Sequence, residues 1–354
     1  MSSQLAEIAK AMVAPGKGIL AADESTGTAN KRFAPLGIPQ TPEMRRKYRE
    51  MLFTSPGFGE YISGVILYDE TIRQNDSHGK PLAGVIAAAG ALPGIKLDAG
   101  TVPLALGGPD EKITEGLDGL AKRVDEYVKL GAKFAKWRAV IAIDDGIPTH
   151  RCIHANAHAL ARYAAICQAG GLVPIVEPEV LMDGEHSKHS LERSFAVHEW
   201  TLKHVFEELA AADVRFEEMV LKPSMVIPGQ KSGEKKSARE IAEATATVLL
   251  RWAPAAVAGI AFLSGGQADV EATMNLNEIN LVARERNAPW PLTFSYGRAL
   301  QQAAIGLWKG DDANVAAAQS AFAHRAKMNG LAALGRYTPD LEKQRELVGA
   351  GQGA

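Results

Sequence analysis

Short apolar segments recur along the chain, and their spacing limits the folds open to it more than any other feature. Eight such segments occur at intervals of about 30 to 45 residues. Each is bounded by glycine or proline and is apolar at odd and even positions alike, as expected for a strand covered on both faces. The segments are residues 18–23, 64–68, 94–98, 132–138, 172–178, 218–223, 259–264 and 291–295.

Between these segments the apolar residues follow helical spacing. Residues 116–130 place five apolar side chains on one stripe and are followed by Gly131, which suits a helix C-cap. Further helical patterns cover residues 156–168, 194–211 and 237–252. Ser237 and Glu240 are spaced as a capping box at the start of the last pattern.

Alternating strands and helices predict an α/β fold with a parallel sheet. Eight repeats without a break in composition favour a single (β/α)8 TIM barrel over a doubly wound sheet. We expect one barrel domain over residues 1–340, beginning with a helix, and a flexible glycine-rich tail over residues 341–354. Residues 32–56 form a long insertion before the second strand, with a helix at about residues 42–53.

Charge and cysteine content exclude several classes of protein. A formal charge of −2, from 39 basic and 41 acidic residues, gives no general attraction to nucleic acid or to an anionic membrane. The first ten residues lack the pattern of a signal or transit peptide, and no stretch approaches the length of a membrane span. Cys152 and Cys167 are expected to be reduced thiols. We therefore expect a cytoplasmic protein.

Ionisable residues lie within or just after six of the eight apolar segments, where a buried strand should avoid them because an unpaired charge costs several kcal/mol. They are Asp23, Lys96 with Asp98, Lys136 with Arg138, Glu177 with Glu179, Lys222 and Arg298. The C-terminal ends of barrel strands meet at one mouth, where barrel enzymes build their active sites. The pattern therefore predicts one pocket that gathers these groups. The alternative is that they reach solvent separately or form an ion-pair network.

Several lysines in one pocket suit amine catalysis. A lysine attacks a carbonyl only as the neutral amine, which is scarce at neutral pH because its ordinary pKa is about 10.4. Burial and a neighbouring cation both lower such a pKa. We predict Lys222 as the nucleophile, Lys136 as its cationic neighbour and Glu177 as the proton donor and acceptor. Glu179 shares the face of Glu177 and is a further catalytic candidate, and Arg138 shares the face of Lys136 and is a candidate for substrate binding.

Two phosphate sites are predicted on opposite sides of Lys222. The seventh and eighth segments end in Leu263-Ser-Gly-Gly266 and Phe294-Ser-Tyr-Gly-Arg298, and phosphate sites in barrels commonly follow these strands. The candidate residues there are Ser264, Gly265, Gly266, Ser295, Gly297 and Arg298. After the first segment, Ser25, Thr28 and Arg32 could hold a second anion, or Ser25 or Thr28 could simply cap a helix. Two sites around a Schiff-base lysine describe a ketose bisphosphate.

A histidine series is a weaker candidate. His150, His154 and His158 have the spacing of metal ligands on a helix, but no further ligand is evident in the sequence. We interpret them as a solvated helix face, and we expect neither a metal nor a cofactor.

Six motifs together resemble the class I fructose-bisphosphate aldolases, from about residue 15 to residue 340. They are Leu20-Ala-Ala-Asp-Glu-Ser-Thr26, Phe134-Ala-Lys-Trp-Arg138, Ile175-Val-Glu-Pro-Glu179, Leu221-Lys-Pro-Ser-Met225, Phe262-Leu-Ser-Gly-Gly266 and Phe294-Ser-Tyr-Gly-Arg-Ala299. The resemblance implies a lysine-dependent, metal-free lyase of glycolysis and gluconeogenesis. It implies reversible cleavage of fructose 1,6-bisphosphate to the triose phosphates dihydroxyacetone phosphate and glyceraldehyde 3-phosphate. It also implies a homotetramer.

The resemblance carries roles to single residues. Lys222 resembles the Schiff-base lysine, Glu177 the acid and base of imine formation, and Asp23 the carboxylate near the C4 hydroxyl. Lys136 resembles the lysine that tunes the site. The residues that resemble the 1-phosphate side are Ser264, Gly265, Gly266, Ser295 and Arg298, and those toward the other phosphate are Thr28, Arg32 and Lys96.

The sequence departs from the family pattern at its end. Animal members end in a tyrosine that assists proton transfer at C3, whereas this sequence ends in Gly353-Ala354 and its last tyrosine is Tyr337. We expect slower handling of the C3 proton, with Schiff-base formation unaffected. Appending a tyrosine should raise the rate of C3 proton exchange, and an unchanged rate would contradict this expectation.

Other readings stay open from the sequence alone. They are a transaldolase, an aldolase preferring fructose 1-phosphate or sedoheptulose bisphosphate, and a non-catalytic sugar-phosphate sensor or scaffold. Binding alone does not require Lys222, Glu177, Asp23 and Lys136 together, which favours an enzyme.

Overall fold

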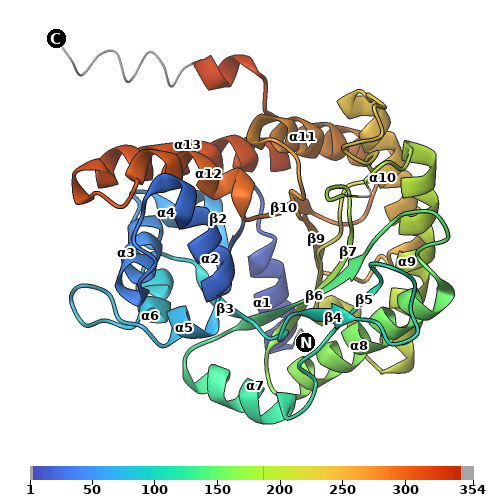
Figure 1. Cartoon of the computed structure of the whole chain (residues 1–354), viewed down its shortest axis with the longest axis horizontal. Coiled ribbons are helices and arrows are strands. Elements are labelled where there is room, and N and C mark those ends of the chain that lie inside the picture. The colour runs from blue at the N-terminus through green and yellow to red at the C-terminus, as the bar shows by residue number, and fades with distance from the viewer. Residues whose placement is uncertain (1–2, 186, 344–354) are drawn as a thin grey trace.

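Eight parallel strands close into a barrel in the computed structural model, which describes residues 3–185 and 187–343 (Figure 1). The strands are β1 (Gly18–Ala22), β2 (Ile62–Leu67), β3 (Leu92–Lys96), β6 (Phe134–Ile141), β7 (Val173–Val180), β8 (Val220–Leu221), β9 (Gly259–Phe262) and β10 (Leu292–Tyr296). Their order around the barrel is β1-β10-β9-β8-β7-β6-β3-β2. Each predicted segment supplies one strand, so the predicted (β/α)8 TIM barrel is confirmed.

Helices surround the barrel, as Figure 1 shows. They are α1 (Gln4–Met12), α2 (Thr26–Phe33), α3 (Pro42–Phe53), α4 (Phe58–Tyr61), α5 (Asp69–Ile72), α6 (Leu82–Ala88), α7 (Leu120–Lys129), α8 (His150–Ala169), α9 (Leu191–Ala211), α10 (Ala238–Trp252), α11 (Asp269–Glu285), α12 (Arg298–Trp308) and α13 (Val315–Ala333). Short 3-10 turns occupy η1 (Ala34–Leu36), η2 (Phe216–Glu218) and η3 (Asp312–Asn314). The capping box of Ser237 and Glu240 at α10 is confirmed, as is the insertion helix α3.

Three predicted helix starts were wrong. The helix expected from residue 194 begins at Leu191, because the Ser190 side chain accepts a hydrogen bond from the Arg193 amide and caps it. The helix expected from residue 116 begins at Leu120, because Gly119 adopts a left-handed conformation with φ of 66° and interrupts the chain there. The helix expected from residue 156 begins at His150, because the Thr149 hydroxyl accepts a hydrogen bond from the Cys152 amide and caps it. Polar residues at the start of this helix masked its first turn.

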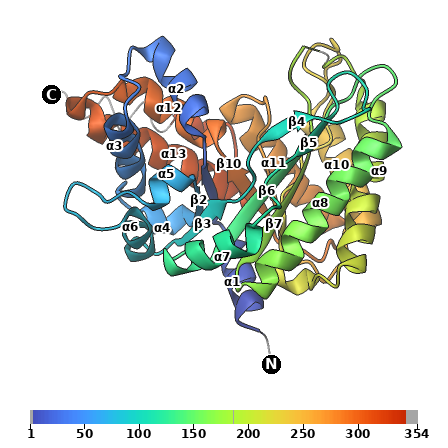
Figure 2. The same ribbon diagram turned by 60° about the horizontal axis from the view of Figure 1, so that its bottom comes forward.

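The two ends of the barrel interior differ in character. At the N-terminal end, Phe134 and Ile175 pack with residues of α1, which closes this end of the barrel (Figure 2). A Cβ on Gly94 would lie 2.3 Å from the Phe134 ring, so glycine is needed for the ring to cross the interior. Further along the same strands, Lys136 on β6 and Glu177 on β7 replace the apolar side chains. The barrel interior is therefore apolar at its N-terminal end and charged at its C-terminal end.

Strand alternation explains this change. On β6, Phe134, Lys136 and Arg138 share the inner face, whereas the buried Trp137 points outward against Tyr163 of α8, with ring centroids 5.5 Å apart. Trp137 therefore packs between the barrel and the surrounding helices.

A hairpin that the sequence patterns did not predict lies at the charged end of the barrel. It consists of β4 (Thr101–Pro103) and β5 (Lys112–Thr114), which pair antiparallel. The Thr114 hydroxyl donates to the Arg138 carbonyl at 2.7 Å and fastens the hairpin to β6. Figure 2 shows this hairpin at the end of the molecule opposite α1. Three-residue strands are too short for a periodic pattern.

The start of the predicted tail packs against the body. Glu342 pairs with Arg325 at 2.6 Å and accepts a hydrogen bond from the Tyr337 hydroxyl at 3.0 Å, so the predicted boundary at residue 340 falls inside a contacting segment. The remainder of that tail, residues 344–354, lies outside the described residues. Cys152 and Cys167 are free and buried. Within the described chain, no helix has the length and apolar character needed to cross a bilayer.

Candidate active site

A cavity of about 470 Å³ opens at the C-terminal ends of the barrel strands. It is lined by the following predicted residues: Asp23, Ser25, Thr28, Arg32, Lys96, Lys136, Arg138, Glu177, Glu179, Lys222, Ser264, Gly265, Ser295, Gly297 and Arg298. The predicted gathering of strand-end charges at one mouth is therefore observed. A second cavity, of about 570 Å³, lies between α4 and α13 and includes none of these residues.

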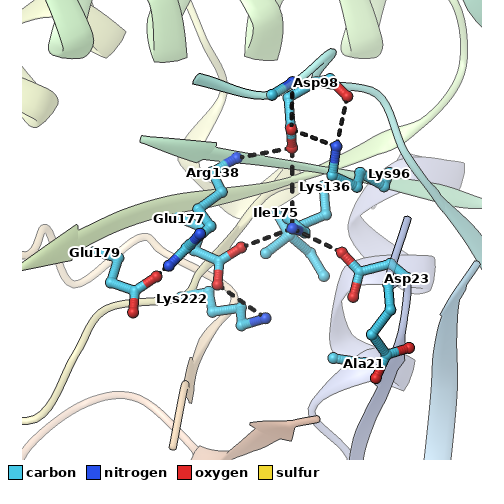
Figure 3. Close-up of polar contacts among 12 residues, drawn as sticks. Ala21, Asp23, Lys96, Asp98, Lys136, Arg138, Ile175, Glu177, Glu179 and Lys222 are labelled. Atoms are coloured by element: carbon cyan, nitrogen blue, oxygen red, sulfur yellow. Dashed lines mark hydrogen bonds and ion pairs between the residues drawn. The ribbon is translucent and has the colours of Figure 1, made fainter. Parts of the chain in front are cut away.

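Four ionisable groups form a continuous chain at the bottom of the cavity at the barrel mouth (Figure 3). Lys222, directly after β8, lies with its Nζ 3.0 Å from Oε1 of Glu177. The other oxygen of Glu177 is 3.2 Å from Nζ of Lys136, which is also 2.8 Å from Oδ2 of Asp23. The Lys136, Glu177 and Lys222 side chains are each 4–5% exposed. Two buried lysines thus alternate with two acidic side chains.

These pairs determine which groups carry charge. Burial disfavours the Lys136 ammonium, but the carboxylates of Asp23, Glu177 and Asp98 outweigh burial and hold the pKa of Lys136 well above its usual value. Burial likewise opposes ionisation of Asp23 and Glu177, yet the neighbouring Lys136 and Lys222 keep both carboxyl pKa values below their usual range. Lys136 is therefore a permanent cation at neutral pH, and both carboxyls are ionised.

Two more pairs line the wall beside this chain. Lys96 lies 2.5 Å from Oδ1 of Asp98, whose other oxygen is 3.9 Å from Lys136. Arg138 pairs with Glu179, and its guanidinium keeps a pKa above the usual value because of that carboxylate. Asp98 therefore holds the Lys96 ammonium at the cavity wall and also lies near Lys136.

The loops after β9 and β10 form one side of the cavity. Gly265 adopts φ of +56°, and a Cβ there would lie 2.8 Å from Sδ of Met182, so the turn requires glycine. Arg298, the first residue of α12, donates to the Gly265 carbonyl at 2.6 Å and to Asp183 at 3.1 Å. The Ser295 hydroxyl is buried on the cavity wall with no hydrogen-bond partner among the described residues. A buried hydroxyl without a partner suits a ligand contact.

Gly266 lies behind this wall and does not line the cavity. Its carbonyl accepts a hydrogen bond from Gln230 at 2.5 Å, and a Cβ would lie 2.3 Å from the same side-chain nitrogen. A Cβ would also lie 2.9 Å from Cβ of Asp183, which cannot swing aside as the Gln230 amide can, so glycine is favoured here. The motif alone could not distinguish this packing role from phosphate binding.

The opposite side is built by the loop after β1 and by α2. Ser25 caps α2 by accepting from the Thr28 amide at 3.3 Å, and the two hydroxyls lie 3.1 Å apart. The capping alternative is therefore correct for Ser25, although both residues also face the cavity. Arg32, one turn further along, extends back to pair with Glu24.

The cavity residues that were not predicted from the sequence include Glu24, Asp183 and Tyr68. Glu24 follows Asp23 directly, and the paired acids at the end of a buried strand were the available signal. Asp183 lies beyond the end of β7, and Tyr68 follows β2 as an ordinary aromatic. Neither residue stands out in the sequence as part of a site, and only the closed barrel brings them to the cavity.

The histidines occupy a different surface. His154 and His158 on α8 are exposed and both contact Glu208 of α9, at 3.1 Å and 2.9 Å. In the part of the chain that the structure describes, no three or more histidine, cysteine, aspartate or glutamate side chains are grouped to hold a metal ion.

Comparison with known proteins agrees with this geometry. The model of the family "Fructose-bisphosphate aldolase class-I" matches residues 4–349. A probable fructose-bisphosphate aldolase class 1 of Xanthomonas campestris is 56% identical over 94% of this chain and 98% of that protein. Fructose-bisphosphate aldolase 2 of Caenorhabditis elegans is 52% identical over 94% of this chain and 90% of that protein.

A solved structure extends the likeness to three dimensions. It is the ternary co-crystal structure of fructose-bisphosphate aldolase from Plasmodium falciparum in complex with TRAP and a small molecule inhibitor. The TM-score is 0.91 at 46% identity, and the match covers 94% of this chain and 95% of that one. Matches of this identity and coverage, together with the lysine and carboxylate cluster at the barrel mouth, show that this chain belongs to the class I fructose-bisphosphate aldolase family.

Proposed function

We propose that Lys222 is the Schiff-base nucleophile in the reaction of this family, the reversible and metal-independent cleavage of fructose 1,6-bisphosphate. The observation that supports this assignment is the contact between Lys222 and Glu177, 3.0 Å apart in a buried part of the cavity. An amine there can attack the ketose carbonyl, and Glu177 can take up and return the protons that carbinolamine formation and dehydration exchange.

The protonated imine then serves as an electron sink. When the C3–C4 bond breaks, its electron pair moves into the imine as an enamine, and the C4 hydroxyl loses a proton to become the aldehyde. Asp23 is the proposed acceptor of that proton. The Lys136 pair keeps Asp23 ionised at neutral pH, as a proton acceptor must be. Glu179 holds Arg138 toward the cavity, and we propose that Arg138 contacts the sugar.

Two groups of anion-binding residues flank Lys222. We assign the 1-phosphate to Ser264, Gly265, Ser295, Gly297 and Arg298, with Gly266 shaping the turn behind them. We assign the second phosphate to Ser25, Thr28, Arg32 and Lys96. Arg32, Lys96 and Arg298 each face a carboxylate in this structure, so a phosphate must compete with those partners.

The second anion site favours a bisphosphate over fructose 1-phosphate. It does not choose between fructose 1,6-bisphosphate and sedoheptulose bisphosphate, because both carry two phosphate groups. The family favours the former. From the family we further propose a homotetramer working in the cytoplasm, with no nucleic-acid or membrane partner.

Borohydride trapping tests the proposal. Incubation with dihydroxyacetone phosphate followed by borohydride reduction should leave one covalent adduct, because reduction converts the imine to a stable secondary amine. Peptide mass spectrometry should place it on Lys222. A pretreatment with EDTA should change neither the adduct nor the rate of cleavage.

An adduct on another lysine, or none, would contradict the proposed nucleophile. Inhibition by EDTA would instead indicate a metal-dependent enzyme, and an adduct formed without cleavage of any ketose phosphate would favour the sensor or scaffold.

A further inference from the structure

Glu24 lies between two arginines at the edge of the cavity. Its Oε1 pairs with Arg32, which faces the cavity, and its Oε2 lies 2.6 Å from Nη1 of Arg49, which does not. Burial opposes ionisation of Glu24, but Arg49 and Arg32 together hold its pKa below the usual range. One carboxylate thus neutralises part of the charge of two guanidiniums.

Arg49 comes from the insertion helix α3, and its side chain is only 3% exposed. Its Nη2 also approaches the Glu24 carbonyl, at 3.5 Å. Gln301, on α12, donates to Glu24 at 3.0 Å and to the Ala21 carbonyl at 2.7 Å. These contacts hold the Glu24 carboxylate at the edge of the cavity. Among Arg32, Arg49 and Gln301, only Arg32 lines the cavity and can reach a ligand.

The net charge of the cluster explains why Glu24 has Arg49 as a second arginine partner. If Glu24 had only Arg32 as a partner, the pair would be neutral and would attract a phosphate weakly. With Arg49 present, the cluster of one carboxylate and two guanidiniums keeps one net positive charge. Because Arg49 is buried, that charge is available to an anion only through Arg32.

We propose that Arg49 is a positioning residue that determines specificity for the second phosphate of the substrate. It acts through Glu24, which it holds back and neutralises so that Arg32 keeps its charge for the ligand. This inference rests on the proposed function, in which Arg32 faces the phosphate remote from Lys222. The insertion helix α3 thereby takes part in the choice between ketose bisphosphates and monophosphates.

The test compares Arg49→Met with the wild type on two substrates. The ratio of kcat/KM for fructose 1,6-bisphosphate to that for fructose 1-phosphate should fall about tenfold, the size expected when one charged contact to a phosphate is weakened. The loss should appear mainly in KM for the bisphosphate. Arg49→Lys retains the charge and should restore most of the ratio.

A double-mutant cycle tests whether Arg49 works through Arg32. Arg32→Met alone should lower the same ratio, and Arg49→Met should lower it little further in that background, since the group through which it acts is gone. If Arg49→Met is not recovered folded, Arg49→Gln takes its place, because the amide can still donate to Glu24 without the charge.

Arg325→Met is the matched control. Arg325 is also buried, at 4% exposure, and pairs with Glu342, and neither residue lines the cavity. Its loss should alter stability but not the substrate ratio. The inference would be overturned if Arg49→Met lowered kcat/KM equally for both substrates, so that their ratio did not change. It would also be overturned if the effects of Arg49→Met and Arg32→Met on that ratio were additive.

Borohydride trapping distinguishes a failure of the proposed role of Arg49 from a failure of the proposed function. Dihydroxyacetone phosphate has no second phosphate, so Arg49→Met should still form the adduct on Lys222. If Arg49 does not influence phosphate specificity, the wild type and Arg49→Met both form the adduct on Lys222, and the ratio of kcat/KM for the two substrates is the same in both proteins. If the proposed function is wrong, the wild type itself does not trap there.

Discussion

Replacing Lys222 with methionine is expected to lower turnover of fructose 1,6-bisphosphate by at least about four orders of magnitude, because no other group can form the imine that accepts the electrons of the C3–C4 bond. The borohydride adduct should disappear at the same time. Lys136 cannot substitute, since Asp23, Glu177 and Asp98 keep it protonated.

The fold should survive this substitution. Glu177 retains Lys136 as a partner at 3.2 Å, so no buried carboxylate is left unpaired. The melting temperature should stay within about 4 °C of the wild-type value, as measured by circular dichroism. Lys17→Met is a control, because Lys17 donates to the Gly59 carbonyl and does not line the cavity; it should keep both turnover and adduct. Loss of folded protein in Lys222→Met would mean that the lysine is structural.

Replacing Lys136 with methionine is expected to damage both stability and activity. The ammonium lies 2.8 Å from Asp23 and 3.2 Å from Glu177, and both carboxylates would be left buried with less compensation. Removing one partner of a buried ion pair typically costs about 3 to 5 kcal/mol. Turnover should fall by at least about 100-fold, because the proton affinities of both catalytic carboxyls change.

The stability loss in Lys136→Met should depend on pH with a defined sign. In the wild type, Asp23 and Glu177 have lowered pKa values, so their contribution to stability is present above the usual carboxyl pKa, near 4, and is lost as the pH falls through the folded values. In the variant, burial without Lys136 raises these pKa values, so stability is lost as the pH rises. The difference in the free energy of unfolding between the wild type and Lys136→Met should therefore be largest at neutral pH and should become smaller toward pH 4.

Urea unfolding between about pH 4 and pH 8 measures this difference. Lys96→Met serves as the comparison, since Asp98 keeps contacts with Lys136 and with the Arg138 amide after Lys96 is removed; its stability loss should be smaller. A gap between wild type and Lys136→Met that is constant with pH would mean that Lys136 contributes by packing rather than by charge.

Much of this site could be predicted because its residues lie in short sequence patterns that can be recognised locally. Strands buried on both faces show as apolar runs, and an ionisable residue within such a run, such as Lys136 or Glu177, is conspicuous because an unpaired buried charge is costly. Since parallel strands of a barrel end at the same mouth, these residues could be brought together from the sequence without knowing any distance.

Other parts required the folded chain. Glu24 and Asp183 looked like ordinary acidic residues, and their partners Arg49 and Arg298 are distant in sequence. The β4–β5 hairpin was missed because strands of three residues carry no periodic signal. Gly266 was assigned to a ligand contact from its motif, and its close approach to Cβ of Asp183 became visible only in the folded chain.

The barrel, its order of strands and helices, and the set of charged residues at its mouth could all be predicted from the amino-acid sequence, because they follow from the period and burial of each segment. The pairing of each carboxylate with its cation was visible only in the folded chain. Glu177 lies between Lys136 and Lys222, and Glu24 lies between Arg32 and Arg49, because neighbouring strands and the insertion helix meet at particular registers. Coulomb energies depend on those distances of a few ångströms, which no local pattern in the chain encodes.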